Sequence, residues 1–452
     1  MSSTTRAASW CGSAPTLLSA TFFRRSKANQ SNPHPFPLPV GERVRERGRG
    51  KVAREQKSSK GAALDGIRVV AFEQVLAGPF CTCILGDMGA EVIKVERPGT
   101  GDLIRHWDKA VRGLSSGYVW LNRNKRNLTV DVKKEKGREI LHRLLRQADV
   151  FLENYAPGVA ERSGLGYEKL KSLNPRLIYC SLSGYGQDGP YRDVKAYDLL
   201  IQGEGGIIAT TGYPDKPARA SIAIVDIASG MYAALGIVLA LFHREKTGKG
   251  QYVDISMFES IVSWLGYFPH HYWHQNEEPK RMGMRHNYVT PYGPYLARSG
   301  KYVNVAVATA KDWEVFCKEV IQKPELLQDA RFATVEARRQ NRAVLEEMIE
   351  KIFLERDHDE WLERLKKAQL PYGEVRGIAE VLAHPQAIAR RLIREVESPV
   401  GRVPVVGNPL RLSDSPARYG RIPDLGEDTE AILREAGYDA ATIEKLHLEK
   451  VI

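Results

Sequence analysis

Along most of the chain, short apolar runs alternate with segments of helical periodicity. From Leu64 onward, runs rich in β-forming residues at 66–72, 91–96 and 127–132 predict strands. An Ala/Gly-rich segment through Met88 predicts a close-packed helix, and apolar residues spaced three and four apart predict another over 134–148. Strands that alternate with helices indicate an open, mainly parallel α/β sheet with Rossmann-like connectivity.

The same alternation continues further along the chain. It predicts strands at 149–154, 176–182 and 252–257 and a short helix at 167–173. The segment 227–244 is apolar on nearly every face, so we expect a buried helix there. Beyond Pro269 the composition becomes aromatic and basic, which indicates a smaller α/β unit. We therefore predict a large Rossmann-like domain at 62–262, a linker at 263–282, a small domain at 283–380, and a C-terminal segment at 381–452 that returns to the large domain.

Residues 1–61 differ from the rest and are set aside for fold prediction. They are rich in Ser, Arg and Pro and show no sustained hydrophobic period. Since no Met occurs between Met1 and Met88, one interpretation is a mis-assigned start in translated non-coding repeat. The first thirty residues, with basic but no acidic side chains, also fit a mitochondrial presequence. A disordered arm is the third interpretation.

The charge of the chain is unevenly distributed. Of the formal +11, residues 1–60 carry +9, so about +2 is left for the remaining 392 residues. A nearly neutral folded part argues against nucleic acid as a partner. The longest uninterrupted apolar run, 231–242, is shorter than the roughly 18 residues that a bilayer span needs. Five scattered cysteines favour a reducing compartment. We expect a cytoplasmic protein without a membrane partner, or a mitochondrial matrix protein if the presequence is real.

Two acidic residues are candidates for chemistry. Asp226 stands directly before the apolar helix, where a carboxylate is either an ordinary N-cap or a nucleophile stabilised by the helix N-terminus. Tyr197 and Asp198 follow a predicted strand and a Gly/Pro-rich loop, where α/β sheets place either turns or ligand contacts. The first strand-to-helix turn begins at Glu73 and lacks the Gly-x-Gly-x-x-Gly pattern, so NAD in the standard position is not expected.

Two basic groups allow further interpretations. His270 and His274 share one helical face and could form a metal pair, but no clear carboxylate ligand accompanies them, so we expect a packing or surface role and no metal. Arg281 and Arg285, next to His286, either hold a substrate carboxylate or form a solvated charge cluster.

Six sequence blocks together resemble the class III CoA-transferases. They begin at Leu76, Leu85, Asn122, Glu153, Gly184 and His243 and read LAGP, LGDMGAEVIKVERP, NRNKR, ENYAPG, GYGQDGP and HREKTGKGQ. Each block is weak alone, but six in this order form a specific signal that covers about residues 64–439. This family includes formyl-CoA:oxalate and succinyl-CoA:glutarate CoA-transferases and α-methylacyl-CoA racemase.

The resemblance implies a role for many individual residues. Asp226 matches the nucleophilic aspartate of the family, with backbone N–H groups at the helix start expected to stabilise oxyanions. Coenzyme A or acyl-CoA would be a substrate, with no permanently bound cofactor, and family members form interlocked homodimers. Implied CoA contacts are Leu76, Ala77, Arg97, Val130, Lys133, Asn154, Tyr155, Arg162, Lys195, Tyr197 and Asp198, and the four cations among them are plausible partners of the CoA phosphates and ribose.

The resemblance also orders the possible reactions. The Gly-rich flap of the formyl-CoA enzymes is missing, and the shorter segment 282–286 takes its place, as in the branch that uses dicarboxylates such as succinate. Racemase relatives have a His where this chain has Tyr197, and a Tyr of ordinary pKa is a poor partner for two-base proton exchange. We therefore predict a CoA-transferase that works through an aspartyl-CoA thioester on Asp226. The alternatives are a racemase-type enzyme and a non-catalytic acyl-CoA-binding protein.

Overall fold

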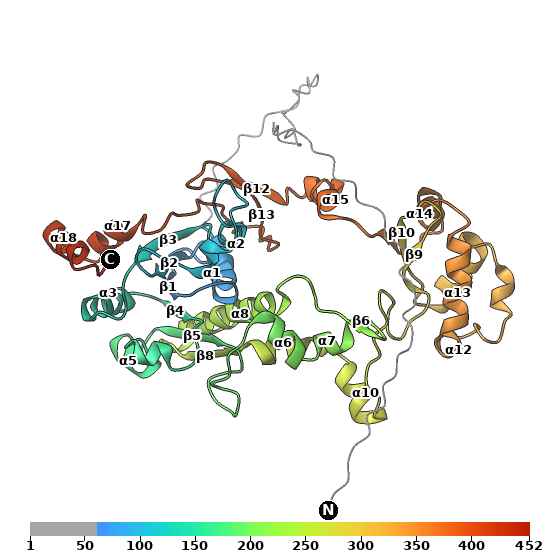
Figure 1. Cartoon of the computed structure of the whole chain (residues 1–452), viewed down its shortest axis with the longest axis horizontal. Coiled ribbons are helices and arrows are strands. Elements are labelled where there is room, and N and C mark those ends of the chain that lie inside the picture. Colours follow the sequence, from blue (N-terminus) through green and yellow to red (C-terminus); the bar gives the residue numbers. More distant parts are fainter. Residues whose placement is uncertain (1–60) are drawn as a thin grey trace, which may run out of the picture. The chain divides into compact units, whose positions relative to one another are not determined.

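The computed structural model describes residues 61–452, so the interpretations of residues 1–60 lie outside the described residues. Six strands form one parallel sheet in the order β3-β2-β1-β4-β5-β8 (Figure 1). They are β1 (Arg68–Phe72), β2 (Glu91–Glu96), β3 (Lys125–Thr129), β4 (Val150–Glu153), β5 (Ile178–Ser183) and β8 (Tyr252–Ser256). The predicted parallel α/β sheet is confirmed, with β3 two residues earlier than expected.

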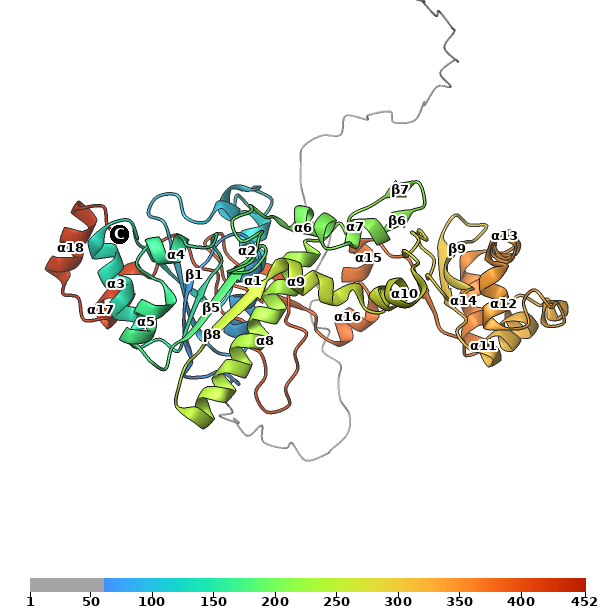
Figure 2. The ribbon, with the colours of Figure 1, turned by 90° about the horizontal axis from the view of Figure 1, so that it is seen from below.

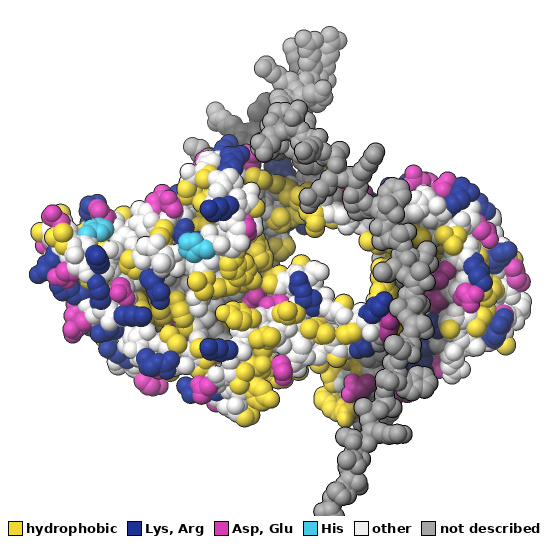
Figure 3. Space-filling view, viewed as in Figure 1, with side chains coloured by type: hydrophobic (Ala, Val, Ile, Leu, Met, Phe, Trp, Pro, Cys, Tyr) yellow, Lys and Arg dark blue, Asp and Glu magenta, His cyan; other side chains and the backbone are white. Residues whose placement is uncertain are grey.

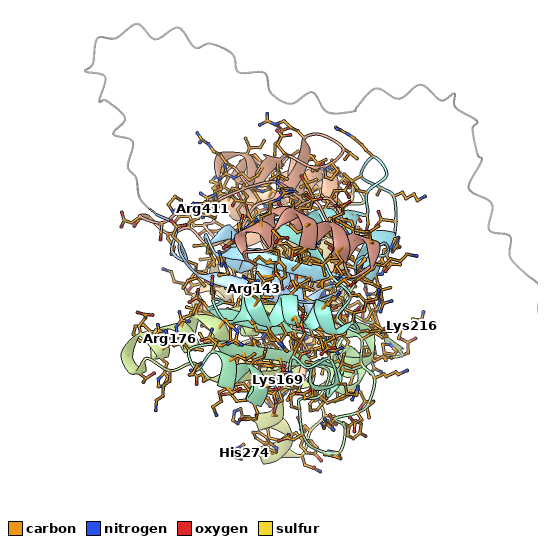
Figure 4. The ribbon with its side chains drawn as sticks, turned by 90° about the vertical axis from the view of Figure 1, so that its left-hand side faces the viewer. Arg143, Lys169, Arg176, Lys216, His274 and Arg411 are labelled. Carbon is orange, nitrogen blue, oxygen red and sulfur yellow. The ribbon has the colours of Figure 1, made fainter. Side chains whose placement is uncertain are left out.

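Helices cover both faces of this sheet because its strands are apolar on both sides. On β1, Val69 and Ala71 belong to the core beneath α1 (Ala77–Asp87) and α8 (Ile224–Thr247). Val70 and Phe72 point to the other face and its core. That face carries α3 (Glu135–Leu145), α5 (Tyr167–Leu173), α17 (Thr429–Glu435) and α18 (Ala440–Leu448). Figure 4 looks onto this second helical layer, with Arg143 on α3 and Lys169 on α5.

The long helix α8 is buried on one face only. Small residues at 230, 233 and 234 let it pack closely on α1. The opposite face exposes five large apolar side chains, each 41–59 % accessible: Met231, Leu235, Val238, Leu239 and Phe242. The expectation of a helix buried all round was therefore wrong. Among residues 61–452, α8 is the one helix long and apolar enough to span a membrane, although half of its most apolar window is buried, as in the core helices of soluble proteins.

Shorter elements connect the strands and lead away from the sheet. They are η1 (Leu103–His106), α2 (Ser116–Leu121), α4 (Val159–Arg162), α6 (Asp198–Glu204), α7 (Ile207–Thr210), β6 (Gly212–Tyr213), β7 (Lys216–Pro217), α9 (Met257–Val262), η2 (Ser263–Leu265) and α10 (Phe268–Gln275). In Figure 2, α6 and α7 follow one another toward the β6–β7 hairpin.

Residues 292–374 build an apolar core of their own around Tyr295, Phe353 and Trp361. Its antiparallel sheet has the order β11-β10-β9. The elements are β9 (Tyr292–Leu296), β10 (Tyr302–Ala306), α11 (Ala310–Val315), η3 (Phe316–Val320), η4 (Pro324–Leu327), α12 (Val335–Gln340), α13 (Arg342–Phe353), α14 (His358–Lys367) and β11 (Tyr372–Glu374). The domain boundaries drawn from the sequence remain predictions.

The segment after β11 packs against residues from the start of the fold. It contains α15 (Ile378–Leu382), α16 (Pro385–Ala389) and the antiparallel pair β12 (Ile393–Val396) and β13 (Val403–Val406). Apolar residues of α17, α18 and the segment after them, such as Ile432, Leu446 and Val451, belong to the core on the α3 side of the sheet.

On the face of the molecule in Figure 3, acidic and basic side chains are interspersed.

Candidate active site

The residues implied in CoA binding gather along one edge of the parallel sheet. Leu76 and Ala77 follow β1, Arg97 follows β2, and the segment 130–133 follows β3. Asn154 and Tyr155 follow β4, and Arg162 ends the helix α4 after them. Lys195 and Tyr197 come between β5 and α6, and Asp198 is the first residue of α6. Since the strands are parallel, their carboxyl ends share an edge, and β1 and β4 leave it in opposite directions, as at ligand sites of open α/β sheets.

Four of these residues are exposed cations. Arg97, Lys133, Arg162 and Lys195 are exposed, and within residues 61–452 none of their charged groups forms a hydrogen bond or ion pair. Arg97 and Lys133, which follow neighbouring strands, line one surface pocket of about 580 Å³. The structure therefore brings two of the predicted phosphate partners together and leaves all four available to an anion.

The turn between β1 and α1 is held in a strained conformation. Val75 has φ = 63°, a left-handed backbone that a β-branched residue rarely adopts. Its N–H donates to Asp102 Oδ1 at 2.9 Å. Asn154 brackets the preceding residue: its Oδ1 accepts from the Gln74 N–H at 2.8 Å and its Nδ2 donates to the Gln74 carbonyl at 2.9 Å. The side chain of Asn154 therefore fixes the turn that presents Leu76 and Ala77.

A buried ionic network stands behind this turn. Lys94 Nζ lies 2.8 Å from Asp102 Oδ2, and Lys125 Nζ lies 2.8 Å from Glu73 Oε1, with all four side chains almost completely buried. Thr82 of α1 donates to Glu73 Oε2 at 2.7 Å. Burial raises the pKa of Asp102, but the Lys94 charge and the hydrogen bonds from Lys94, Val75 and Ile104 together outweigh burial, and the pKa falls below its ordinary value. The network ties β1, β2 and β3 to the start of α1.

Asp226 lies within the first turn of α8 and does not cap it. The helix begins at Ile224, with Ala223 as N-cap, so the interpretation of Asp226 as the N-cap was wrong. Instead, Asp198 Oδ1 of α6 accepts the N–H groups of Val225 at 2.8 Å and Asp226 at 3.3 Å. Gln202 Nε2 holds the other oxygen of Asp198 at 2.6 Å.

The remaining N–H groups of this turn are also engaged. Ile224 donates to the Ile222 carbonyl at 2.8 Å, and Ile227 donates to the Ala223 carbonyl at 3.0 Å. Backbone donors at the start of α8 are therefore not free to stabilise an oxyanion, which corrects the sequence-based expectation. In the first turn of α1, by contrast, the N–H groups of Ala77 and Gly78 have no acceptor in the described structure. Gly230, one turn after Asp226, packs on this turn: a Cβ there would lie 2.7 Å from the Ala77 carbonyl oxygen.

The carboxyl group of Asp226 is itself unpartnered and half-buried in the described structure. Burial, together with the neighbouring Asp198 carboxylate, raises its pKa from an ordinary 3.8 to about 7. A carboxylate that is poorly solvated and accepts no hydrogen bond keeps its lone pairs available for attack on an electrophile. This arrangement is compatible with a carboxylate nucleophile, which attacks in its anionic form.

The other predicted residues have structural partners or lie on the surface. Tyr197 is the N-cap residue of α6 and is 68 % exposed. Arg281 donates to the carbonyls of Ala209, Tyr213 and Pro214. Arg285 pairs with Glu346 and Glu350, both at 2.9 Å. A substrate carboxylate would have to replace these contacts, so the binding role of the two arginines stays a prediction.

His270 and His274 stack with ring centroids 6.3 Å apart. Both side chains are exposed, which agrees with the interpretation of a packing or surface role. Over residues 61–452, no group of three His, Cys, Asp or Glu side chains is placed to hold a metal ion.

Sequence reasoning missed the residues that position the site. Lys94 and Lys125 are charged residues inside buried strands, and that mismatch with their surroundings was the available signal. Glu153, at the end of β4, was also missed as an acid: burial raises its pKa to about 7, and it accepts from Ser181 Oγ at 2.5 Å and the Tyr155 N–H at 3.0 Å.

Comparisons with known proteins agree with this geometry. The model of the family described as CoA-transferase family III matches residues 64–429. A human succinyl-CoA:glutarate CoA-transferase is 37 % identical over 389 residues, covering 85 % of this chain and 88 % of the relative. An acetyl-CoA:oxalate CoA-transferase of Acetobacter aceti is 36 % identical over 82 % of this chain and 95 % of the relative.

Solved structures show the same likeness. The crystal structure of a CaiB/BaiF family protein from Brucella suis has a TM-score of 0.74 and 37 % identity, covering 83 % of this chain and all of the other. The resemblance inferred from the six sequence blocks is thereby confirmed. The chain belongs to CoA-transferase family III and is a CoA-transferase.

Proposed function

We propose that this enzyme moves CoA from a donor acyl-CoA, such as succinyl-CoA, to an acceptor carboxylic acid through covalent intermediates on Asp226. The observation that carries the proposal is the unpartnered, half-buried carboxyl group of Asp226. The backbone N–H of this residue donates to Asp198, and its helix packs on the turn that presents Leu76 and Ala77. Its position suits the thioester end of a CoA molecule that lies along the carboxyl edge of the sheet.

The first half of the reaction loads CoA onto the enzyme. An oxygen of the Asp226 carboxylate attacks the thioester carbonyl, and the C–S bond breaks, which gives an acyl–aspartyl anhydride and CoA thiolate. The thiolate then attacks the aspartyl carbonyl of the anhydride. The donor acid leaves as its carboxylate, and an aspartyl-CoA thioester remains.

The second half repeats these steps with the acceptor. The acceptor carboxylate attacks the aspartyl-CoA thioester and forms a new anhydride, and the released thiolate attacks the acceptor carbonyl. Asp226 returns as a carboxylate and the new acyl-CoA departs. One thioester replaces another, so the bonds balance without ATP. Donors for the oxyanions fit the first turn of α1, where the Ala77 and Gly78 N–H groups are free in the described structure.

The acceptor is proposed to be a short dicarboxylate. Succinyl-CoA:glutarate relatives support this choice, as does the segment 282–286 in place of a Gly-rich flap. Relatives that are named for oxalate define the competing acceptor. A screen of acceptor acids with succinyl-CoA, read by mass spectrometry for new CoA esters, tests the pair. New esters with glutarate-sized acids support the proposal, whereas transfer to oxalate or formate alone overturns it.

Replacement of Asp226 tests the mechanism. We expect Asp226→Ala to lose transfer by at least about a thousandfold, the scale seen when catalytic groups are removed, while CoA still binds. Asp215→Ala is the matched control, because Asp215 is an exposed acid in the β6–β7 turn with no partner in the described structure. Transfer at the wild-type rate by Asp226→Ala would refute the role of Asp226. CoA binding without any transfer by the wild-type protein would favour the non-catalytic alternative.

A racemase-type activity is tested separately. Tyr197, at the position of the racemase His, is 68 % exposed and forms no hydrogen bond with Asp226 in the described structure. We therefore expect no exchange of the α-proton of a 2-methylacyl-CoA in deuterated water when no acceptor acid is present. Rapid exchange under these conditions would replace the transferase proposal with the racemase one.

We also propose a homodimer in which the exposed face of α8 is covered. Met231, Leu235, Val238, Leu239 and Phe242 recur at helical spacing and form an apolar stripe on that face. Light scattering after gel filtration gives the mass directly. Leu239→Glu is expected to shift the mass from dimer toward monomer, whereas an unchanged dimer mass would place the interface elsewhere.

A further inference from the structure

The pocket that contains Arg97 and Lys133 is completed by residues from a distant part of the sequence. The loops after β2 and β3 form one side, and the end of α18 with the residues after it forms the other. The polar and charged side chains that line its volume of about 580 Å³ are Arg97, Asp131, Lys133, Lys134, His447 and Lys450. Five of the six are basic, and none of the residues from the α18 side belongs to the blocks that carry the family resemblance.

Lys450 occupies a backbone position that normally suits glycine. Its φ is 53°, and it follows Glu449, the C-cap residue of α18. The Lys450 N–H donates to the His447 carbonyl at 2.8 Å and the Val451 N–H to the Leu446 carbonyl at 2.9 Å, which is the Schellman pattern of helix ends. A lysine at this position costs stability relative to glycine, so its side chain is expected to serve a purpose that glycine cannot.

The backbone at Lys450 is fixed to the loop that follows β3. Asp131 N–H donates to the Val451 carbonyl at 2.7 Å, and Lys134 Nζ donates to the Lys450 carbonyl at 2.9 Å. Val451 is completely buried in the core next to the sheet. The side chain of Lys450 therefore leaves a rigid support, at the rim of the pocket, without the freedom of a loose chain end.

Three of the basic side chains that line the pocket have no partner in the described structure. Lys134 is engaged with backbone carbonyls, and His447 Nε2 lies 3.6 Å from Glu430. In the described structure the charged groups of Arg97, Lys133 and Lys450 have no hydrogen-bond or ion-pair partner. Asp131, whose Oδ1 accepts from the Lys133 N–H at 3.0 Å, supplies the opposing carboxylate. The pocket thus favours a ligand with several negative charges.

We propose that Lys450 binds the 3′-phosphate of CoA, in a nucleotide subsite that it forms with Arg97 and Lys133. This inference rests on the proposed function, which places the thioester at Asp226. The pocket lies at the end of the sheet formed by β2 and β3, away from β5 and the Asp198 that holds Asp226. The nucleotide is the end of CoA opposite the thiol, and its 3′-phosphate is a negatively charged group at that end.

Calorimetric titration with CoA and with dephospho-CoA, which lacks the 3′-phosphate, tests the assignment. We expect Lys450→Ala to weaken CoA binding about three- to tenfold and to leave dephospho-CoA binding unchanged. Lys450→Arg should restore binding of CoA. Lys445→Ala is the matched control, because Lys445 is exposed on the same helix and does not line the pocket. Equal affinity of wild type and Lys450→Ala for CoA, or equal weakening for both ligands, would overturn the assignment.

Lys450→Gly separates ligand binding from a purely structural role. Glycine relieves the left-handed strain, so we expect the melting temperature to rise while CoA affinity falls as it does for Lys450→Ala. A rise in melting temperature with unchanged CoA affinity would contradict the inference. The proposed function fails separately, if the wild-type protein binds no CoA or transfers none. If the wild-type protein binds and transfers CoA and the Lys450 variants bind CoA with the wild-type affinity, only the assignment of Lys450 to the 3′-phosphate is removed.

Discussion

The Asp198 carboxylate is predicted to raise the pH at which Asp226 becomes a nucleophile. Asp198 accepts the N–H groups of Val225 and Asp226 and, by repulsion, helps burial raise the pKa of Asp226 to about 7. The anion is the attacking form, so kcat/KM for acyl-CoA should rise with pH and reach half its plateau near pH 7. Asp198→Asn removes the negative charge and keeps an oxygen that can accept the same two N–H groups.

The size of the shift follows from electrostatics. Two unit charges about 5 Å apart repel by about 0.8 kcal/mol in water and about 3 kcal/mol at an effective dielectric constant of about 20. Burial is the larger cause of the raised pKa, so Asp198 contributes less than half of the rise from 3.8 to about 7. We therefore predict that Asp198→Asn lowers the midpoint of the pH profile by about 0.5–1.5 pH units.

The assay is kcat/KM between pH 5 and 9 for the wild-type enzyme and Asp198→Asn. Asp188→Asn serves as the control, because Asp188 is an exposed acid in the loop after β5 and is not a cause of the Asp226 shift. The overall rate of Asp198→Asn is expected to fall, because Gln202 would face an amide, but the position of the midpoint does not depend on that loss. A midpoint that stays in place or moves upward would refute the electrostatic role of Asp198.

Three further predictions concern stability and packing. Asp226→Asn should stabilise the fold at pH 8 but not at pH 4, because a carboxyl group with a raised pKa lowers the free energy of unfolding as the pH rises from about 4 to 7. The full rise in pKa corresponds to about 4 kcal/mol of unfolding free energy, and partial exposure of the group reduces this to about 1–3 kcal/mol. Urea unfolding at the two pH values measures the difference. Lys94→Met should destabilise the protein by about 3–5 kcal/mol, because Asp102 loses its buried partner; a loss below about 1 kcal/mol would contradict this. Gly230→Ala should lower both melting temperature and kcat, because the new Cβ would collide with the Ala77 carbonyl oxygen. Gly236→Ala serves as the control, because the nearest atom to its Cβ would belong to a side chain, 3.0 Å away. Equal effects of the two substitutions would contradict the packing argument.

Hydrophobic patterning was sufficient for the parallel sheet but not for the burial of every helix. Alternation of strands and helices predicted the strands within a few residues, because each strand is a compact apolar run with clear ends. The pattern of α8 was misread, since apolar residues on all faces do not distinguish a fully buried helix from one with an uncovered face. Val238 and Leu239 lie on the uncovered face of α8 and are exposed.

In the candidate site, the sequence located the individual residues but not the contacts between residues far apart in the chain. Family resemblance pointed to Asp226 and to the candidate CoA-binding residues, and the sheet topology brought those candidates to one edge. Capping of α8 by Asp198, and the hold of Asn154 on the turn at Gln74, join residues 27 and 80 positions apart. No local pattern reveals such contacts, although Lys94 in the middle of an apolar strand was a visible anomaly.

Direct detection of a covalent intermediate tests the central claim. The enzyme is incubated with succinyl-CoA and trapped with hydroxylamine, which converts an aspartyl anhydride or thioester to a hydroxamate, or with borohydride, which reduces the thioester to an alcohol. Digestion and mass spectrometry then locate the modification. The account predicts modified Asp226, absent without acyl-CoA and absent from Asp226→Ala. An enzyme that turns over while Asp226 stays unmodified, or one that carries the label on another residue, would contradict it.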